Sequence, residues 1–428
     1  MPIFLSILKA NGQIDKIPED SVFIGELSLT GEVCPVNGVL PMTIHAMQSG
    51  FKNIFVPHEN AAEAAVISGI NVYPIKNVKE LTDFIQLEKP ISLQPHTKVV
   101  KEKSDAHLDF CQVKGQYDVK RALEIAAAGG HNILLIGPPG SGKSMLAKRL
   151  PTILPEMTFD ETIETTKIYS IAGILKGASP LITERPFRSP HHTISRIGLS
   201  GGGTTPHPGE LSLAHNGILF LDELSEFSRS TMEALRQPLE EGQITISRVR
   251  GTLTFPCSIM LVAAMNPCPC GYFGHPTKSC TCSSHAIARY LARVSGPMLD
   301  RMDIHVEVPP VDFENLSSEE NLETSEEIRK RVNKARAIQQ ERYKNENIVC
   351  NSSIPAHILH KSCPMTENAK NILKGAFESM GLSARGYDKI LKIARTIADL
   401  DGSEVIDTRH VAEAVQYRSL DRKYWNNR

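Results

Sequence analysis

The sequence predicts an α/β fold, with a parallel sheet covered by helices on both faces and a wholly helical region after it. Two observations lead to this fold class. From His107 to Pro310, apolar runs alternate with helix-compatible stretches such as Asp118–Ala128, an alternation typical of parallel sheets. Beyond Pro310 only helical patterns remain. Within the alternating region we expect strands at Asn132–Ile136, Gly217–Leu221 and Ile259–Ala264.

Four segments follow from these patterns. Residues 1–86 mix short apolar strands with helical stretches and predict a small α/β domain, whereas residues 87–106 are polar, contain Pro and Lys, and predict a linker. Residues 107–310 form the expected core and 311–428 a helical lid. In the lid, Thr324 and Glu327 have the spacing of a capping box, and further helices are expected at roughly 366–380, 385–400 and 408–418.

The composition excludes several classes of protein. Lys+Arg (47) and Asp+Glu (48) nearly cancel in the 428 residues, so any contact with nucleic acid has to come from local basic loops. No apolar run approaches the roughly 20 residues that span a bilayer. The first residues lack the basic start of a signal peptide, and nine Cys with four in a tight cluster argue against a disulfide framework. We expect a cytoplasmic protein without a membrane partner.

A phosphate-binding loop follows the first expected strand of the core. The segment matches G-x-x-x-x-G-K-[ST] between a strand and a helix, the context that gives this pattern its meaning. Its glycines let backbone N–H groups surround a phosphate, its Lys reaches the β- and γ-phosphates, and its Ser binds Mg²⁺. The predicted nucleotide-binding residues are Gly137, Pro138, Pro139, Gly140, Ser141, Gly142, Lys143 and Ser144.

An acidic pair supplies the second half of this site. The strand Gly217–Leu221 ends in Asp222 and Glu223. Asp222 is expected beside the Mg²⁺, and Glu223 is expected to polarise the attacking water. The two halves together predict an ATPase that uses ATP and Mg²⁺.

Three further residues are candidates for catalysis, each with a plainer alternative. Asn266 ends the third strand and is expected to hold the attacking water, unless it merely starts the Asn-Pro turn. Arg301 is expected to reach the γ-phosphate of a neighbouring subunit, with Arg293 as its rival and a surface salt bridge as the alternative. Arg385, at the start of a lid helix, is expected to reach the nucleotide from the other side; ordinary surface charge is the alternative.

Two C-x-C pairs stand on either side of a short loop rich in Gly and Pro. Cys268, Cys270, Cys280 and Cys282 would satisfy a tetrahedral, structural Zn²⁺. The one-residue spacing within each pair is tighter than in common zinc knuckles. Four reduced cysteines without metal are the alternative.

Two basic segments are candidates for contact with DNA. The first, residues 184–203, contains Arg185 and Arg188, and the second, residues 244–254, alternates around Arg248 and Arg250 and predicts a β-hairpin. Repeated around a ring, such loops form a positive funnel that grips the phosphate backbone without base readout. Packing between subunits, with these Arg paired to acids, is the alternative.

Long segments of the chain resemble the ComM/YifB family of bacterial AAA+ ATPases, which is related to the ATPase subunit of magnesium chelatase. The matching segments include GGHNILLIGPPGSGKSMLAKRLPTILP, FRSPHHTISRIGLSGGG, PHPGELSLAHNGILFLDELSEF, AAMNPCPCGYFG and LSARGYDKILKIARTIADL. The resemblance implies an AAA+ fold, a homo-hexamer, and branch migration of DNA in recombination and natural transformation as the activity. It also implies the roles given above for the core residues, which are Lys143, Ser144, Asp222, Glu223, Asn266, Arg301 and Arg385.

The first segment departs from the family pattern. Phe23–Val33 and Phe55–Asn60 resemble only the second half of the Lon-like (S5-like) α/β domain with which the family begins. A Lon-type peptidase needs a Ser nucleophile activated by a Lys. No Lys lies between Glu32 and Phe51, where that family has it, so we expect no proteolysis.

Two other functions remain as alternatives to a DNA motor. A chelatase-type ATPase that remodels a metal-insertion partner would share the lid and the ATP site but would not need basic hairpins. An inactive remnant would lack ATPase activity altogether. The ATPase rate with and without branched DNA separates these functions.

Overall fold

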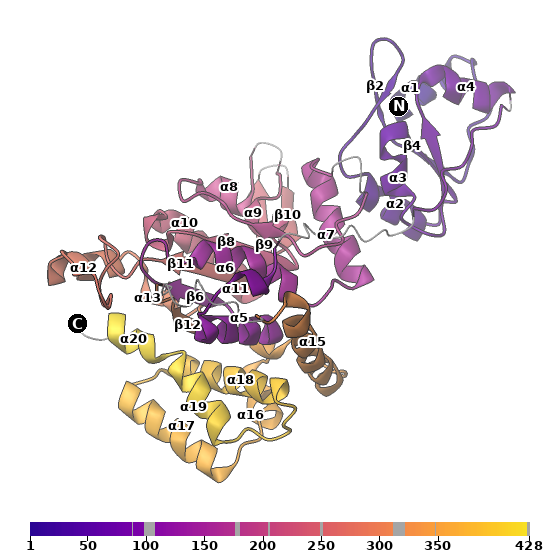
Figure 1. Ribbon diagram of the computed structural model, residues 1–428. Coiled ribbons are helices and arrows are strands. Elements are labelled where there is room, and N and C mark those ends of the chain that lie inside the picture. The colour runs from indigo at the N-terminus through magenta and orange to yellow at the C-terminus, as the bar shows by residue number, and fades with distance from the viewer. Residues whose placement is uncertain are drawn as a thin grey trace. The chain divides into compact units, whose positions relative to one another are not determined.

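The computed structural model describes residues 1–87, 89–97, 108–175, 180–203, 206–248, 251–310, 322–346 and 348–425. The chain divides into two compact units. The smaller unit contains residues 1–103 and 157–184, and the larger unit contains residues 104–156 and 185–428. Figure 1 shows their helices and strands along the chain. Each unit is described here by itself.

A five-stranded parallel sheet organises the larger unit. Its strand order is β12-β6-β11-β8-β7, and every neighbouring pair is parallel. The apolar runs of the sequence form the central strands because both faces of the sheet are covered. The expected α/β fold is confirmed. The strands are β6 (Ile133–Ile136), β7 (Phe187–Arg188), β8 (Gly217–Leu221), β11 (Ile259–Met265) and β12 (Ile304–Glu307).

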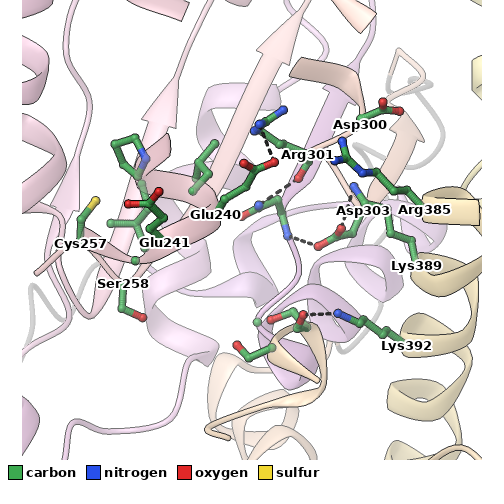
Figure 2. Close-up of a pocket in the computed structure, with 18 residues that line it drawn as sticks. Glu240, Glu241, Cys257, Ser258, Asp300, Arg301, Asp303, Arg385, Lys389 and Lys392 are labelled. Atoms are coloured by element: carbon green, nitrogen blue, oxygen red, sulfur yellow. Dashed lines mark hydrogen bonds and ion pairs between the residues drawn. The ribbon is translucent and has the colours of Figure 1, made fainter. Parts of the chain in front are cut away.

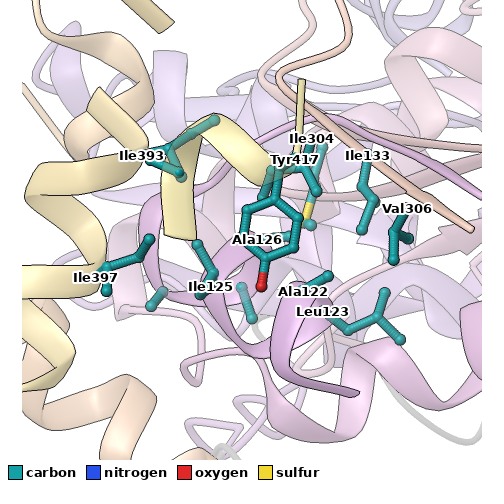
Figure 3. Close-up of a cluster of buried hydrophobic side chains, with 14 of the residues drawn as sticks. Ala122, Leu123, Ile125, Ala126, Ile133, Ile304, Val306, Ile393, Ile397 and Tyr417 are labelled. Atoms are coloured by element: carbon teal, nitrogen blue, oxygen red, sulfur yellow. The ribbon is translucent and has the colours of Figure 1, made fainter. Parts of the chain in front are cut away.

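Helices α5 (Tyr117–Gly129) and α18 (Ala384–Leu400) join the sheet to the lid in one core. Figure 3 shows Leu123 and Ala126 of α5 among Ile133 of the sheet and Ile393 of α18. All four side chains are fully buried. The lid therefore packs through α5 onto the sheet. The shorter helices of this unit outside the lid are α6 (Lys143–Arg149), α8 (Arg196–Ser200), α9 (Glu210–Leu213), α10 (Arg229–Ala234), α11 (Arg236–Glu241), α12 (Ser284–Leu291) and α13 (Gly296–Leu299).

The lid is helical throughout its described part, as expected. Thr324 and Glu327 form the predicted capping box at the start of α15 (Ser325–Arg342). A buried carboxylate, Asp399, fixes the lid from within, because Arg342 Nη1 lies 2.9 Å and Arg395 Nε 3.1 Å from its oxygens. The remaining lid helices are α16 (Ala356–Ser362), α17 (Glu367–Met380), α19 (Thr408–Gln416) and α20 (Ser419–Tyr424).

The predicted β-hairpin is present in the larger unit. Strands β9 (Gln243–Arg248) and β10 (Gly251–Pro256) pair antiparallel, with Arg248 opposite Gly251. Most of β10 is exposed, including Leu253 at 47%. Residues 251–254 of β10 are thus accessible to solvent.

The smaller unit has its own parallel sheet, in the order β1-β4-β5. Phe55 stacks between Phe23 and Tyr73, with ring centroids 4.6 and 4.7 Å apart. The small α/β domain expected here is present. Its strands are β1 (Ser21–Phe23), β2 (Glu26–Leu27), β3 (Val33–Cys34), β4 (Asn53–Pro57) and β5 (Asn71–Ile75), and its helices are α1 (Pro2–Ala10), α2 (Val39–Gln48), α3 (Ala61–Ala64), α4 (Val78–Leu87) and α7 (Phe159–Ala172).

Helix α7 belongs to the smaller unit although its sequence interrupts the core predicted at 107–310. Ile163 of α7 and Leu181 share a buried cluster with Leu40 and Val66, so apolar packing ties this stretch to residues far away in the sequence. The linker predicted at 87–106 lies largely outside the described residues, and the predicted domain boundaries stay predictions. Every helix in the described ranges is too short or too polar to cross a bilayer.

Candidate functional site

The phosphate loop leaves the carboxyl end of β6 and enters α6. Gly140 and Gly142 have φ of 77° and 87°, a region that suits glycine. A Cβ atom at Gly140 would meet no atom beyond its chain neighbours within 4 Å, so nothing packs against the loop at this glycine. The loop has the form of a cradle for an anion.

Lys143 folds back over this loop. Its Nζ donates to Gly137 O at 2.8 Å, to Pro138 O at 2.9 Å and to Asn266 Oδ1 at 3.2 Å. Burial lowers the pKa of Lys143 to about 8, although Asp222 and Glu223 oppose that shift. The sequence-predicted Asn266 therefore meets Lys143 at the mouth of the loop.

Ser144 and Asp222 meet at the carboxyl ends of β6 and β8. Ser144 Oγ donates to Asp222 Oδ2 at 2.6 Å. A hydroxyl and a carboxylate are oxygen ligands of the kind that Mg²⁺ prefers. The residues present thus fit the divalent cation that accompanies ATP.

Glu223 follows with an unusual backbone and a neighbour that the sequence did not predict. Its φ is 53°, which is uncommon for a residue other than glycine. Its carboxylate lies 3.5 Å from His192 Nδ1, and the His192 ring lies 4.1 Å from the ring of His191. The first basic segment therefore reaches the proposed catalytic acid. In the sequence, the adjacent histidines His191 and His192 after the short strand β7 were the signal that could have indicated this contact.

A second polar site lies at the opposite edge of the sheet. A cavity of about 570 Å³ is lined by Asn132, which precedes β6, by Ile259 at the start of β11, and by Asp303, which precedes β12. Parallel strands all begin at this edge. Figure 2 shows its basic side chains, which are Arg301, Arg385, Lys389 and Lys392.

Asp303 anchors the lid to this edge of the sheet. Its carboxylate accepts from the backbone N–H of Asn132 at 3.1 Å and pairs with Lys389 Nζ at 3.0 Å. Burial alone would raise the pKa of Asp303, but Lys389 and His131 hold it well below its ordinary value. Helix α18 is thus fixed so that its first turn, with Arg385, borders the cavity.

The structure separates the predicted site residues into two groups. Lys143, Ser144, Asp222, Glu223 and Asn266 gather at the carboxyl edge of the sheet. Arg301 and Arg385 line the cavity at the amino edge, so Arg385 is not brought to the phosphate loop of its own subunit. Arg293, the rival of Arg301, forms an exposed ion pair with Glu226 at 2.8 Å.

Two of the four arginines expected to contact DNA are engaged inside the protein. Arg185 donates to Pro155 O at 2.6 Å and to Asn216 O at 2.7 Å. Arg188 forms a bidentate ion pair with Glu210, in which Nε and Nη2 each donate to a carboxylate oxygen at 2.7 Å. Both guanidinium groups thus have partners within the protein, and their contact with DNA stays a prediction. The side chain of Arg248 and all of Arg250 lie outside the described residues.

The four-cysteine module, residues 268–282, brings its four sulfur atoms together. All lie within 4.8 Å of one another, and the three pairs among Cys268, Cys270 and Cys280 are 3.3, 3.5 and 3.7 Å apart. A Zn²⁺ about 2.3 Å from each of four sulfurs requires sulfur–sulfur distances of about 3.8 Å. The thiols are free of disulfides, so the donor set fits zinc. A Cβ on Gly271 would approach Pro139 Cδ to 2.5 Å, so the module packs directly against the phosphate loop.

Comparison with known proteins gives three family matches. The family model described as magnesium chelatase, subunit ChlI, matches residues 109–316. The C-terminal model of that subunit matches residues 322–418, and a further ChlI model matches residues 1–60.

Individual relatives match almost the whole chain. Competence protein ComM of Haemophilus influenzae is 43% identical over 99% of this chain and 82% of its own length. The uncharacterized protein YifB of Escherichia coli is 40% identical over the same shares. Lon protease 2 of Bacillus subtilis is 39% identical over 93 residues, 21% of this chain and 17% of that protein. The chain therefore belongs to the ComM/YifB family of magnesium chelatase-like AAA+ ATPases.

Proposed function

We propose that this protein is a ring-forming motor, a homo-hexamer that hydrolyses ATP between neighbouring subunits and acts on branched or single-stranded DNA. The observation that carries the proposal is the separation of the nucleotide-directed residues. One edge of the sheet carries the phosphate loop and its acids, and the opposite edge carries Arg301 and Arg385. Neither edge is a complete site. A ring brings the second edge of one subunit to the first edge of the next.

The carboxyl edge binds the nucleotide. The phosphate loop and Lys143 hold the β- and γ-phosphates, which replace the carbonyl and amide partners that Lys143 now has. Ser144 and Asp222 hold Mg²⁺, which when bound neutralises phosphate charge. Glu223 accepts the proton of the attacking water, and Asn266 orients that water.

The amino edge serves the neighbouring subunit. Arg301 stabilises the charge that develops on the neighbour's γ-phosphate. Arg385 acts on the same nucleotide, because the structure places it beside the same cavity as Arg301. The nucleotide that Arg385 is expected to reach is, in this proposal, the neighbour's. The ring size of six rests on the family resemblance.

The β9–β10 hairpin is the DNA contact that we propose. Most of β10 is exposed, and in the sequence Arg248 is the last residue of β9 and Arg250 directly precedes β10. Such a hairpin, repeated around a ring, grips phosphates without reading bases. Support for a role in competence comes from the name of competence protein ComM, which is 43% identical, whereas the role in recombination rests on the family resemblance.

A chelatase-type ATPase is the second candidate, because the three matching family models carry the name of a magnesium chelatase subunit. In that case the partner is a metal-insertion enzyme, and DNA affects neither binding nor turnover. A titration of labelled forked DNA at two salt concentrations separates the candidates. The DNA motor binds with an affinity that falls steeply with salt.

We also propose a structural Zn²⁺ in the four-cysteine module, in the reducing cytoplasm. The compact set of four free thiols supports this site. Elemental analysis of the purified protein should give one zinc per chain, and Cys280→Ser should lose it. A wild-type protein purified without chelators and free of zinc would contradict the site.

Mixing of inactive subunits tests the shared active site. Arg301→Ala should bind ATP normally but not hydrolyse it, and Lys143→Ala should not bind it. In mixed rings, some interfaces combine the intact loop of an Arg301→Ala subunit with the intact arginine of a Lys143→Ala subunit, so part of the activity should return. Mixed rings that assemble by size-exclusion chromatography yet remain inactive would contradict the proposal.

A further inference from the structure

Arg301 is held inside its own subunit. Its Nη2 lies 2.6 Å from Glu240 Oε1, its Nη1 donates to Pro297 O at 2.6 Å, and its Nε donates to Arg236 O at 3.3 Å. Only 12% of its side chain is exposed. Charge-assisted pairs of this kind are the stronger hydrogen bonds of proteins. In this arrangement, Arg301 reaches a phosphate of another subunit only by leaving Glu240.

Two of the described basic groups of the cavity are open to solvent: Arg385, which is exposed, and Arg301, through its exposed partner Glu240. The carboxylate of Glu240 is 53% exposed. Lys389, by contrast, is held by the largely buried Asp303, and Lys392 donates to the backbone oxygen of Ser352 at 2.9 Å. An anion that enters the cavity can therefore pair with Arg385, and it has to displace the Glu240 carboxylate to pair with Arg301. Figure 2 shows the interaction between Glu240 and Arg301 as a dashed line.

Glu240 also lies at the base of the β9–β10 hairpin. It lies in the last turn of α11, which passes through Gly242, with φ of 65°, directly into β9. The backbone N–H of Cys257, just beyond β10, donates to Gly242 O at 2.7 Å and closes the hairpin at its base. Arg301 contacts both the beginning and the end of α11, through Arg236 O and Glu240. Movement of this short helix is therefore transmitted to both strands of the hairpin.

We propose that Glu240 occupies Arg301 in place of the neighbour's phosphate, and that exchange between these two partners couples the nucleotide state of one subunit to the hairpin of the next. Arriving phosphate repels the Glu240 carboxylate and attracts Arg301, so α11 is released and the hairpin moves. In the other direction, DNA that pulls on the hairpin withdraws Glu240 and frees Arg301. Glu240 is thus a positioning residue that restrains the motor while DNA is absent. This inference rests on the proposed role of Arg301 in trans.

The test uses the full chain and two neighbouring acids. Glu240→Gln keeps the shape of the side chain but removes its charge, and should raise the ATPase rate without DNA by about threefold to tenfold, because a neutral acceptor holds Arg301 less strongly. The KM for ATP should fall, since the neighbour's ATP no longer has to displace a charged acid from Arg301. Glu241→Gln is the matched control, because Glu241 accepts from Gln237 at 2.9 Å instead of Arg301.

Stimulation by forked DNA gives the second readout. DNA and Glu240→Gln release the same restraint, so DNA should stimulate this variant less than the wild type or Glu241→Gln. The double variant Glu240→Gln/Arg301→Ala should be as inactive as Arg301→Ala alone. Light scattering should confirm that each variant forms rings.

The outcomes separate the inference from the proposed function. If Arg301→Ala is inactive while Glu240→Gln equals the wild type in rate and DNA stimulation, the restraint by Glu240 is refuted and the role of Arg301 stands. A Glu240→Gln variant as slow as Arg301→Ala also refutes the restraint, since the carboxylate would then support catalysis. Wild-type activity in Arg301→Ala refutes the trans role and the inference with it.

Discussion

Replacement of Gly271 by alanine tests how closely the four-cysteine module supports the phosphate loop. Gly271 has φ of +83°, and a Cβ there would lie 2.5 Å from Pro139 Cδ. Gly274 of the same module has φ of +77°, but its Cβ would lie 3.8 Å from the end of the Lys423 side chain, an ordinary contact. Gly274→Ala is therefore a control with the same backbone cost and no collision.

The magnitudes follow from this difference. Both alanines bear the cost of a left-handed conformation, about 1–2 kcal/mol each. Only Gly271→Ala adds overpacking against a proline ring, about 1–3 kcal/mol more. Displacement of Pro139 shifts the phosphate loop and so destabilises the ATP complex. Each 1.4 kcal/mol by which the ATP complex is destabilised relative to the free protein lowers ATP affinity about tenfold.

Urea unfolding and titration with a fluorescent ATP analogue measure both effects. We expect Gly274→Ala to lose a little stability and keep its ATP affinity, and Gly271→Ala to lose more stability and bind ATP several-fold more weakly. Equal stability and equal ATP affinity in the two variants would refute the proposed support of the loop by the module.

Three further predictions concern the proposed sites. Lys143→Ala should abolish nucleotide binding, whereas Glu223→Gln should bind ATP and lose about 100-fold or more in turnover; wild-type turnover in Glu223→Gln would refute its assignment. The pKa of Lys143, about 8 against an ordinary 10.5, means that its charge is present below pH 8 and is lost above it. ATP affinity should therefore fall as pH rises past 8, by up to tenfold per unit, and a flat titration from pH 7 to 10 would contradict this. Replacing Arg248 and Arg250 with alanine should weaken DNA binding and flatten its salt dependence by about one counterion per lost phosphate contact. Arg188→Ala, which breaks the pair with Glu210, should lower stability instead; an equal loss of DNA affinity in both would contradict the hairpin assignment.

The carboxyl edge of the sheet was predictable because its residues lie at fixed places on strands. A glycine-rich loop after one strand and Asp222 after another must meet at the same edge of a parallel sheet. Asn266 ends the strand between them in the sheet and so arrives beside Lys143. For these residues, the order of strands is enough to determine proximity.

The amino edge was less predictable because it depends on packing between distant segments. Arg385 lies at the start of a helix. The sequence predicts that this helix is amphipathic, but it does not predict which element the helix packs against. Buried contacts of α18 with α5, together with the Lys389–Asp303 pair, bring its first turn to the cavity. The contact between Arg301 and Glu240 spans 61 residues of sequence, and no local pattern specifies it.

The basic segments show the same limit. Arg185 and Arg188 stand in a stretch with few acids, which favoured a DNA contact. Their partners, the backbone of Asn216 and the side chain of Glu210, follow more than 20 residues later. Local charge density therefore does not show which arginines already have partners inside the protein.

The central claim is that ATP hydrolysis by a ring of these subunits moves DNA. Its most direct test is the conversion of a labelled four-way DNA junction into its duplex products, with Glu223→Gln as the matched control that binds ATP. We expect ATP-dependent conversion by the wild type and none by Glu223→Gln. Rings that hydrolyse ATP at the same rate with and without the junction, and leave it intact, would contradict the account.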